Sequence, residues 1–162
     1  MNHFFARRAI VATMAVSLAL IMSLNSSWAA NSNSIETPAE ATVDLYTRMS
    51  ARDLDGVLRL IPADGFTEVG MGEGEARRLD KQAFEGLFKT DLMINMRAVD
   101  VKVQDFGDTA IVTGTRVGSI TPKGDQAKES RHLFTMVWVK TDDRWLLRHA
   151  HLSAVASLQA GH

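Results

Sequence analysis

The sequence contains no cysteine, and this absence excludes disulfide bonds and thiolate chemistry. An excess of charge of one sign is also missing, because 18 lysines and arginines stand against 19 aspartates and glutamates. A domain with this balance has no basic surface for nucleic acid or anionic lipid, so neither is predicted as a partner. The chain has no internal repeat and, after its N-terminal segment, no second candidate transmembrane run.

The N-terminal segment has the three parts of a secretory signal peptide. Two arginines precede an apolar run over residues 9–24, and the polar stretch that follows ends at Ser27-Trp28-Ala29. Cleavage after Ala29 places small residues three and one positions before the cut, as signal peptidases require. An uncleaved anchor is the alternative, but the apolar run is shorter than the roughly 20 residues that span a bilayer. The pattern predicts a periplasmic or secreted protein with no stable membrane insertion after cleavage.

Cleavage after Ala29 leaves 133 residues (162 − 29), enough for one domain with a single core and too few for two. We predict a signal peptide at 1–29, a flexible leader at 30–36, one folded domain at 37–155 and a short tail at 156–162. Because no disulfide is possible, the stability of this domain must come from its core or from an oligomer.

The first half of the predicted domain carries signals for three helices. Thr37-Pro38-Ala39-Glu40 is typical of a helix start, since Thr37 can cap, Pro38 fits the first turn and Glu40 completes a capping box. A short second helix is expected before Pro62, and Asp80 can cap a third. The stripe of the first helix that is predicted to face the core consists of Ala39, Val43, Tyr46 and Met49.

The second half is predicted to form a sheet. A short strand is expected at 66–69, before a glycine-rich loop that lacks the Gly-Lys-Ser/Thr sequence of a phosphate loop. Alternating valines then mark a long strand from Ile94 to Phe106, and three further strands follow up to Val155. The short polar segments Gly107-Asp108 and Asp142-Asp143 are typical of hairpin turns. A long-stranded sheet after a helical half predicts an α+β fold with helices on one sheet face.

The amino-acid sequence of the last strands is the part of the chain that is most specific for a protein family. It reads GDTAIVTG at 107–114, VWVK at 137–140 and Arg144-Trp145 followed by His151 and Ser153. In these segments and in the order of its predicted helices and strands, the chain resembles the nuclear transport factor 2-like superfamily, which includes SnoaL-like and ketosteroid-isomerase-like proteins. The resemblance covers most of the predicted domain. It implies a cone, in which a curved, mostly antiparallel sheet wraps around three N-terminal-half helices and encloses a pocket.

The resemblance also implies a test for ketosteroid isomerase chemistry, which uses a carboxylate base, a Tyr and a protonated Asp. Tyr46 matches the Tyr position. By alignment the base position falls at Val69, with Glu68 beside it, and the second acid falls at Thr135. Because valine cannot accept a proton, the acid–base set is not retained and steroid isomerisation by that route is not expected.

Two histidines on the last strand are candidates for chemistry. His149 and His151 lie two residues apart, so both point to one face together with Trp145. An imidazole there could act as a base near neutral pH. Alignment to the isomerase pattern places the opposite face inside, but the apolar content favours Trp145 and Leu147 inside. We therefore expect the face with Trp145 to line the pocket.

The preceding strand contributes two further candidates. His132 shares a face with Phe134, Met136 and Trp138, and Arg131 lies on the other face. Arg131 is the candidate anion anchor if that other face is the inner one, and a surface ion pair is its alternative. His132 with the two later histidines could ligate a metal. No carboxylate at ligand spacing supports this, so no metal and no cofactor is predicted.

These observations favour an exported domain that binds a small apolar or amphipathic molecule inside the cone. The predicted pocket consists of Tyr46, Arg131, Trp145, His149 and His151, with the Tyr46 hydroxyl hydrogen-bonded to a strand histidine. One alternative is an isomerase, dehydratase or hydrolase-type enzyme that uses Tyr46 with His149 or His151. Another is a dimerising scaffold module with a vestigial pocket. A homodimer through the outer sheet face is also expected, because three helices can cover only one face.

Overall fold

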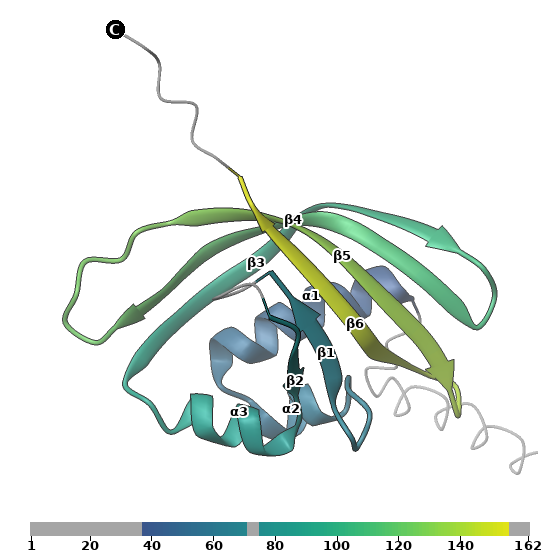
Figure 1. Cartoon of the computed structure of the whole chain (residues 1–162), viewed down its shortest axis with the longest axis horizontal. Helices are drawn as coiled ribbons and strands as arrows, with labels where there is room; N and C mark the ends of the chain where they lie inside the picture. The colour runs from purple at the N-terminus through teal and green to yellow at the C-terminus, as the bar shows by residue number, and fades with distance from the viewer. Residues whose placement is uncertain (1–36, 71–74, 156–162) are drawn as a thin grey trace, which may run out of the picture. The chain divides into compact units, whose positions relative to one another are not determined.

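Three helices and six strands make up the part of the chain that the computed structural model describes, residues 37–70 and 75–155 (Figure 1). The predicted signal peptide (1–29), leader (30–36) and tail (156–162) and most of the glycine-rich loop lie outside these ranges, so they stay predictions. Between residues 37 and 155, leaving out 71–74, no helix is both long enough and apolar enough to cross a membrane.

The helices begin where their caps predict. They are α1 (Pro38–Ala51), α2 (Leu54–Leu58) and α3 (Lys81–Phe88). Before α1, the Thr37 hydroxyl accepts from the Glu40 N–H at 3.2 Å and the Glu40 carboxylate accepts from the Thr37 N–H at 3.0 Å, which confirms the capping box. The Asp80 carboxylate accepts from the Ala83 N–H at 3.0 Å and caps α3.

The buried face of α1 differs from the predicted stripe. Tyr46 is buried as expected, but Val43 is 47% exposed and the stripe was wrong at this position. Because consecutive residues are rotated by about 100° around a helix, Val43 lies about 200° away from Leu45, at the centre of the buried face. The residues that α1 buries are Pro38, Ala41, Thr42, Leu45 and Tyr46.

The strands form one six-stranded sheet in the order β2-β1-β6-β5-β4-β3. Among the described strands, the β1–β6 pair alone is parallel, so the sheet is mostly antiparallel as predicted. The short strand β2 was not predicted from the sequence. The bounds are β1 (Phe66–Val69), β2 (Arg77–Leu79), β3 (Leu92–Asp105), β4 (Thr109–Pro122), β5 (Ser130–Thr141) and β6 (Arg144–Ala154).

Two irregularities interrupt the long strands. The pairing of β3 with β4 shifts between Val99 and Lys102, and the pairing of β5 with β6 skips Arg148. Each shift adds one residue to one strand, and such bulges bend the strand and increase its twist. The β5–β6 turn is regular, since Asp142 and Asp143 both have positive φ, as a two-residue hairpin turn requires.

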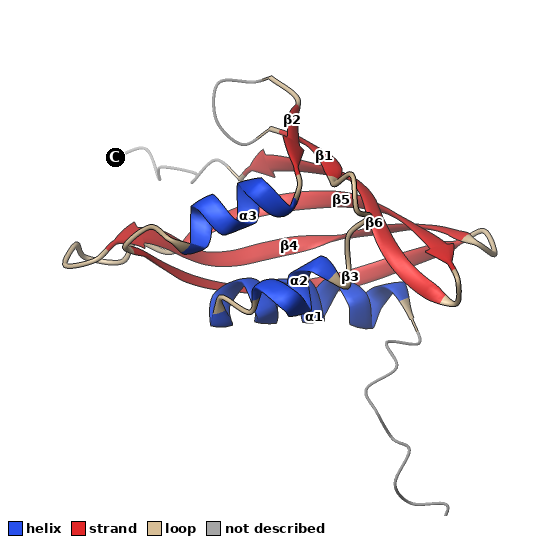
Figure 2. Ribbon diagram, turned by 90° about the horizontal axis from the view of Figure 1, so that it is seen from below, coloured by secondary structure: helices blue, strands red, loops and turns tan. Residues whose placement is uncertain are grey.

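The curved sheet arches over the three helices, which all lie on its concave side (Figures 1 and 2). α1 packs against β3 and β4, and α3 contacts α2 and β2. Ser50 at the end of α1 accepts a hydrogen bond from the Met96 N–H of β3 at 2.9 Å. The core lies between these layers and includes Leu45, Phe84, Trp138 and Leu147. This arrangement confirms the predicted α+β cone.

Candidate functional site

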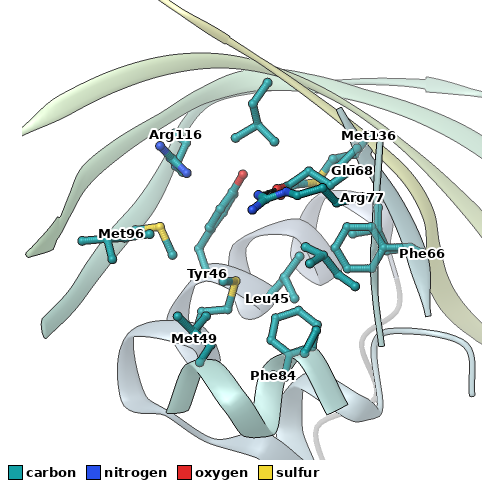
Figure 3. Close-up of a pocket in the computed structure, with 17 residues that line it drawn as sticks. Leu45, Tyr46, Met49, Phe66, Glu68, Arg77, Phe84, Met96, Arg116 and Met136 are labelled. Carbon is teal, nitrogen blue, oxygen red and sulfur yellow. Dashed lines mark hydrogen bonds and ion pairs between the residues drawn. The ribbon is translucent and has the colours of Figure 1, made fainter. Parts of the chain in front are cut away.

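A cavity of about 400 Å³ lies between the concave sheet face and the helices α1 and α3 (Figure 3). Its size is in the range that proteins use for small molecules. Most of its walls are apolar side chains, among them Leu45, Met49, Phe66, Phe84 and Met136. Four polar or charged residues complete the lining: Tyr46, Glu68, Arg77 and Arg116.

Tyr46 enters the cavity from α1, and its ring packs against Phe134 with centroids 5.9 Å apart. The residue is only 3% exposed, and its hydroxyl has no hydrogen-bond partner among the residues that the structure describes. Burial raises the pKa of Tyr46, the nearby Arg116 lowers it and Glu68 raises it, with a net increase. Tyr46 is therefore a neutral hydroxyl at physiological pH, available to donate a hydrogen bond.

Arg116 reaches the cavity because of the period-two alternation of β4. Ala110 and Val112 are fully buried on the concave face, and Arg116 is in phase with them. The Arg116 side chain is buried, and its Nη2 lies 2.8 Å from Nδ1 of His132, the residue directly opposite on β5. A guanidinium can only donate, so His132 must be neutral and must accept at Nδ1. Burial, with a smaller effect of Arg116, lowers the pKa of His132 and favours this neutral form.

Glu68 and Arg77 form the other polar side of the cavity. Glu68 is in phase with the buried Phe66 on β1, and Arg77 comes from the neighbouring strand β2. Their ion pair joins Arg77 Nη2 and Glu68 Oε1 at 2.5 Å. Figure 3 shows the Tyr46 hydroxyl between this pair and Arg116. The lining therefore carries two positive charges and one negative charge, +2 − 1 = +1.

Of the five residues predicted for the pocket, only Tyr46 lines this cavity. Trp145 is buried in the core but is not part of the lining. Arg131 is exposed and lies on the face of β5 opposite Phe134 and Met136, so its predicted position in the pocket is corrected. No binding measurement bears on these residues, and any role of theirs outside the cavity stays a prediction.

The predicted position of His149 and His151 in the pocket is also corrected. Both lie on the outer sheet face, opposite Thr67 and Val69 of β1. The cause is the extra residue Arg148. Before Arg148, Trp145 and Leu147 face the core, as the apolar content predicts. After Arg148, Ala150 and Leu152 face the core, as the isomerase alignment predicts. A bulge reverses the phase of a strand, so each expectation holds for one half of β6.

In β1 and β5, the alignment to ketosteroid isomerase assigns the inner position to a residue that lies on the outer face of the strand. Glu68, not Val69, points into the cavity, and Thr135 is exposed on the outer face. A carboxylate therefore does stand near Tyr46, although it is paired with Arg77. Among residues 37–70 and 75–155, no group of three or more His, Asp or Glu side chains is placed to hold a metal ion.

Glu68, Arg77 and Arg116 were not predicted from the sequence to line the pocket. A signal for Arg116 exists, since it is the one charged residue in the row of alternate residues that begins with Ala110 and Val112. Glu68 is likewise in phase with Phe66. Arg77 had no comparable signal, because the strand that carries it has only three residues.

The fold and the cavity define an α+β cone protein with a largely apolar pocket. A family model of the SnoaL-like domain matches residues 39–157. Because this match covers most of the chain, the chain belongs to the SnoaL-like domain family. A search of curated proteins finds no significant match.

Solved structures share the fold and confirm the resemblance to the nuclear transport factor 2-like (NTF2-like) superfamily. An NTF2-like protein from Salmonella enterica serovar Typhimurium superposes with a TM-score of 0.61 at 15% identity, over 76% of this chain and 92% of that one. A proposed dehydratase of the NTF2-like family from Streptomyces avermitilis gives 0.58 at 24% identity, over 72% and 93%. The S. rosetta CaMKII hub gives 0.56 at 28% identity, over 74% and 98%.

Proposed function

We propose that this chain is an exported domain that binds a small, largely apolar molecule in the cavity between the sheet and α1. The observation that carries the proposal is the Tyr46 hydroxyl, which is buried at the cavity and has no partner within residues 37–70 and 75–155. Buried hydroxyls in proteins are almost always hydrogen-bonded. A bound molecule with a polar group would satisfy Tyr46 while its apolar part contacts the walls.

Export is supported by the pattern of residues 1–29, with its arginines, apolar run and small-residue cleavage site. The mature protein is then expected to begin at Ala30 and to be periplasmic or secreted. N-terminal sequencing of the exported protein checks this, and retention of residues 1–24 contradicts it.

An enzyme of the isomerase or dehydratase type is the second candidate. The proximity of Glu68 to Tyr46 favours it, and one structural neighbour is a proposed dehydratase. Against it, the Glu68 carboxylate is engaged in an ion pair with Arg77. The version that relies on His149 or His151 has no geometric support, because both lie on the outer face. A scaffold with a filled core is disfavoured by the volume of the cavity.

The test compares two alanines. Ala83 lines the cavity on α3, and Ala127 is exposed in the loop between β4 and β5. Ala83→Phe is expected to fill the cavity and to abolish the increase in melting temperature that n-octanol or octanoate produces. Ala127→Phe should show the same increase in melting temperature as the wild-type protein. If neither compound binds the natural chain, or if Ala83→Phe binds both unchanged, the proposal is wrong.

A further inference from the structure

The guanidinium of Arg116 is a buried positive charge that forms no ion pair with a described carboxylate, and Glu68 acts on it only from beyond ion-pair distance. Arg116 is 7% exposed, and no carboxylate of the described chain lies within ion-pair distance of it. Its polar contact is the neutral ring of His132, which supplies an acceptor but no charge. Buried charges in proteins are normally paired, since an isolated charge in a low-dielectric interior is destabilising. This charge lines the cavity, so a ligand can reach it.

We propose that the ligand is an apolar monocarboxylate, whose carboxylate is held by Arg116 and by the Tyr46 hydroxyl. This inference rests on the proposed function and names the chemical class of the ligand. A guanidinium presents its N–H donors in a planar fork that matches the two oxygens of a carboxylate. One N–H is directed to His132, which leaves others for a ligand.

Tyr46 fits the same group. Its raised pKa keeps the hydroxyl protonated, so it donates to an acceptor and does not repel a negative charge. Figure 3 shows its oxygen between Arg116 and the Glu68–Arg77 pair. The Tyr46 hydroxyl and the Arg116 guanidinium are therefore two donors for one ligand group. The other charged side chains of the lining, Glu68 and Arg77, neutralise each other in an ion pair.

The charge of the cavity sets the charge of the ligand. With a net charge of +1 on the lining, one carboxylate leaves the complex neutral, whereas a phosphate monoester would bring up to two negative charges. The rest of the lining is apolar, from Leu45 and Met49 on α1 to Phe84 on α3 and Met136 on β5. The remainder of the ligand is therefore a hydrocarbon chain or ring.

The experiment measures binding of octanoate and of n-octanol, two probes with the same chain and different head groups, by isothermal titration calorimetry. The wild-type protein should bind octanoate at least about tenfold more tightly than n-octanol, because a charge-assisted hydrogen bond adds to its affinity. Arg116→Met should remove this preference and leave n-octanol affinity within about twofold. The matched control is Arg131→Met, which removes an exposed arginine on the outer sheet face and should leave both affinities unchanged.

Each result decides a separate point. Binding of neither probe to the natural chain overturns the proposed function and this inference together. Equal affinity for both probes overturns the monocarboxylate and leaves the proposed function standing. Loss of octanoate binding in Arg131→Met places the anion outside the cavity and also overturns it. If Arg116→Met does not fold by circular dichroism, Tyr46→Phe decides, since it preserves the ring and should weaken octanoate binding about three- to tenfold more than n-octanol binding.

Discussion

Tyr46 concentrates the chemistry of this protein in one side chain. Its ring belongs to the core and packs against Phe134, while its hydroxyl is at the cavity without a partner in the described chain. It is also the one tyrosine of the sequence. Spectroscopic signals of tyrosine ionisation therefore report on this residue alone.

The alkaline titration of Tyr46 follows from its burial. Because burial raises the pKa of the folded state above the ordinary value of about 10, the neutral form stabilises the fold. That stability is complete below about pH 10 and is lost as the pH rises towards the pKa of the folded state. An absorbance titration should show ionisation beginning above pH 10, whereas the chain unfolded in guanidinium should titrate near 10.

The control for this titration is Tyr46→Phe, which should remove the absorbance change and, near pH 10, the tyrosine contribution to the pH dependence of stability. A midpoint at or below about 10 in the folded protein would contradict the burial of the hydroxyl.

At the scale of elements, the bulge of β6 decides which side chains of this strand reach the cavity. The extra residue Arg148 turns His149 and His151 outward and brings Ala150 and Leu152 inward. Near this bulge the Leu147 N–H donates to the Leu60 carbonyl at 2.9 Å, so the segment after α2 helps to hold β6 in this course. The position of a bulge thus depends on neighbours far away in the sequence.

Gly118 allows β3 and β4 to approach closely. Its φ is +142°, and an added Cβ would lie 1.9 Å from the Asn95 carbonyl oxygen of β3. Gly118→Ala is therefore expected to lower the free energy of unfolding by about 2 kcal/mol or more, since both the backbone angle and the contact are unfavourable. Urea unfolding followed by circular dichroism measures this change.

Gly86 on α3 provides the matched control. A Cβ added there would meet no atom of the described structure within 4 Å, and the helix favours alanine over glycine. Gly86→Ala should raise the free energy of unfolding by about 0.5–1 kcal/mol. If both substitutions changed the free energy of unfolding equally, the close approach of β3 and β4 at Gly118 would not be the reason that glycine is needed there.

At the scale of the whole molecule, the three helices lie on the concave side of the sheet (Figure 1). Part of the outer face is exposed, whereas Val117 and Leu146 on that face are buried. Leu133 of β5 is 56% exposed there, and His149 and His151 lie on the same face. We propose that this face forms a homodimer, because an open apolar sheet face is commonly buried by a second copy.

Leu133→Glu is expected to shift the dimer to monomer, since a buried charge without a partner opposes association. Size-exclusion chromatography with light scattering at micromolar concentration measures the mass. Phe106→Glu serves as the control, because Phe106 is exposed in the β3–β4 turn and should leave the mass unchanged. A monomeric natural chain would contradict the proposal.

The sequence by itself determined the local structure and the class of fold. The capping box at Thr37, the cap at Asp80 and the turn at Asp142-Asp143 each depend on a few neighbouring residues, and all three are confirmed. The alternation of β5 likewise placed Phe134 and Trp138 together on one face, but it did not decide that this face is the inner one. Signals of this kind are complete within a short window, so a single sequence contains them.

Only the tertiary structure decided the composition of the cavity. The phase of β6 after Arg148 depends on its pairing with β5 and β1, and Arg77 is brought to Glu68 only by pairing of β2 with β1. Arg116 could have been found from its phase with Val112, but its lack of an ion pair is visible only when every neighbouring strand is in place. Phase and charge pairing are properties of several chain segments together, and for this reason the site required the structure.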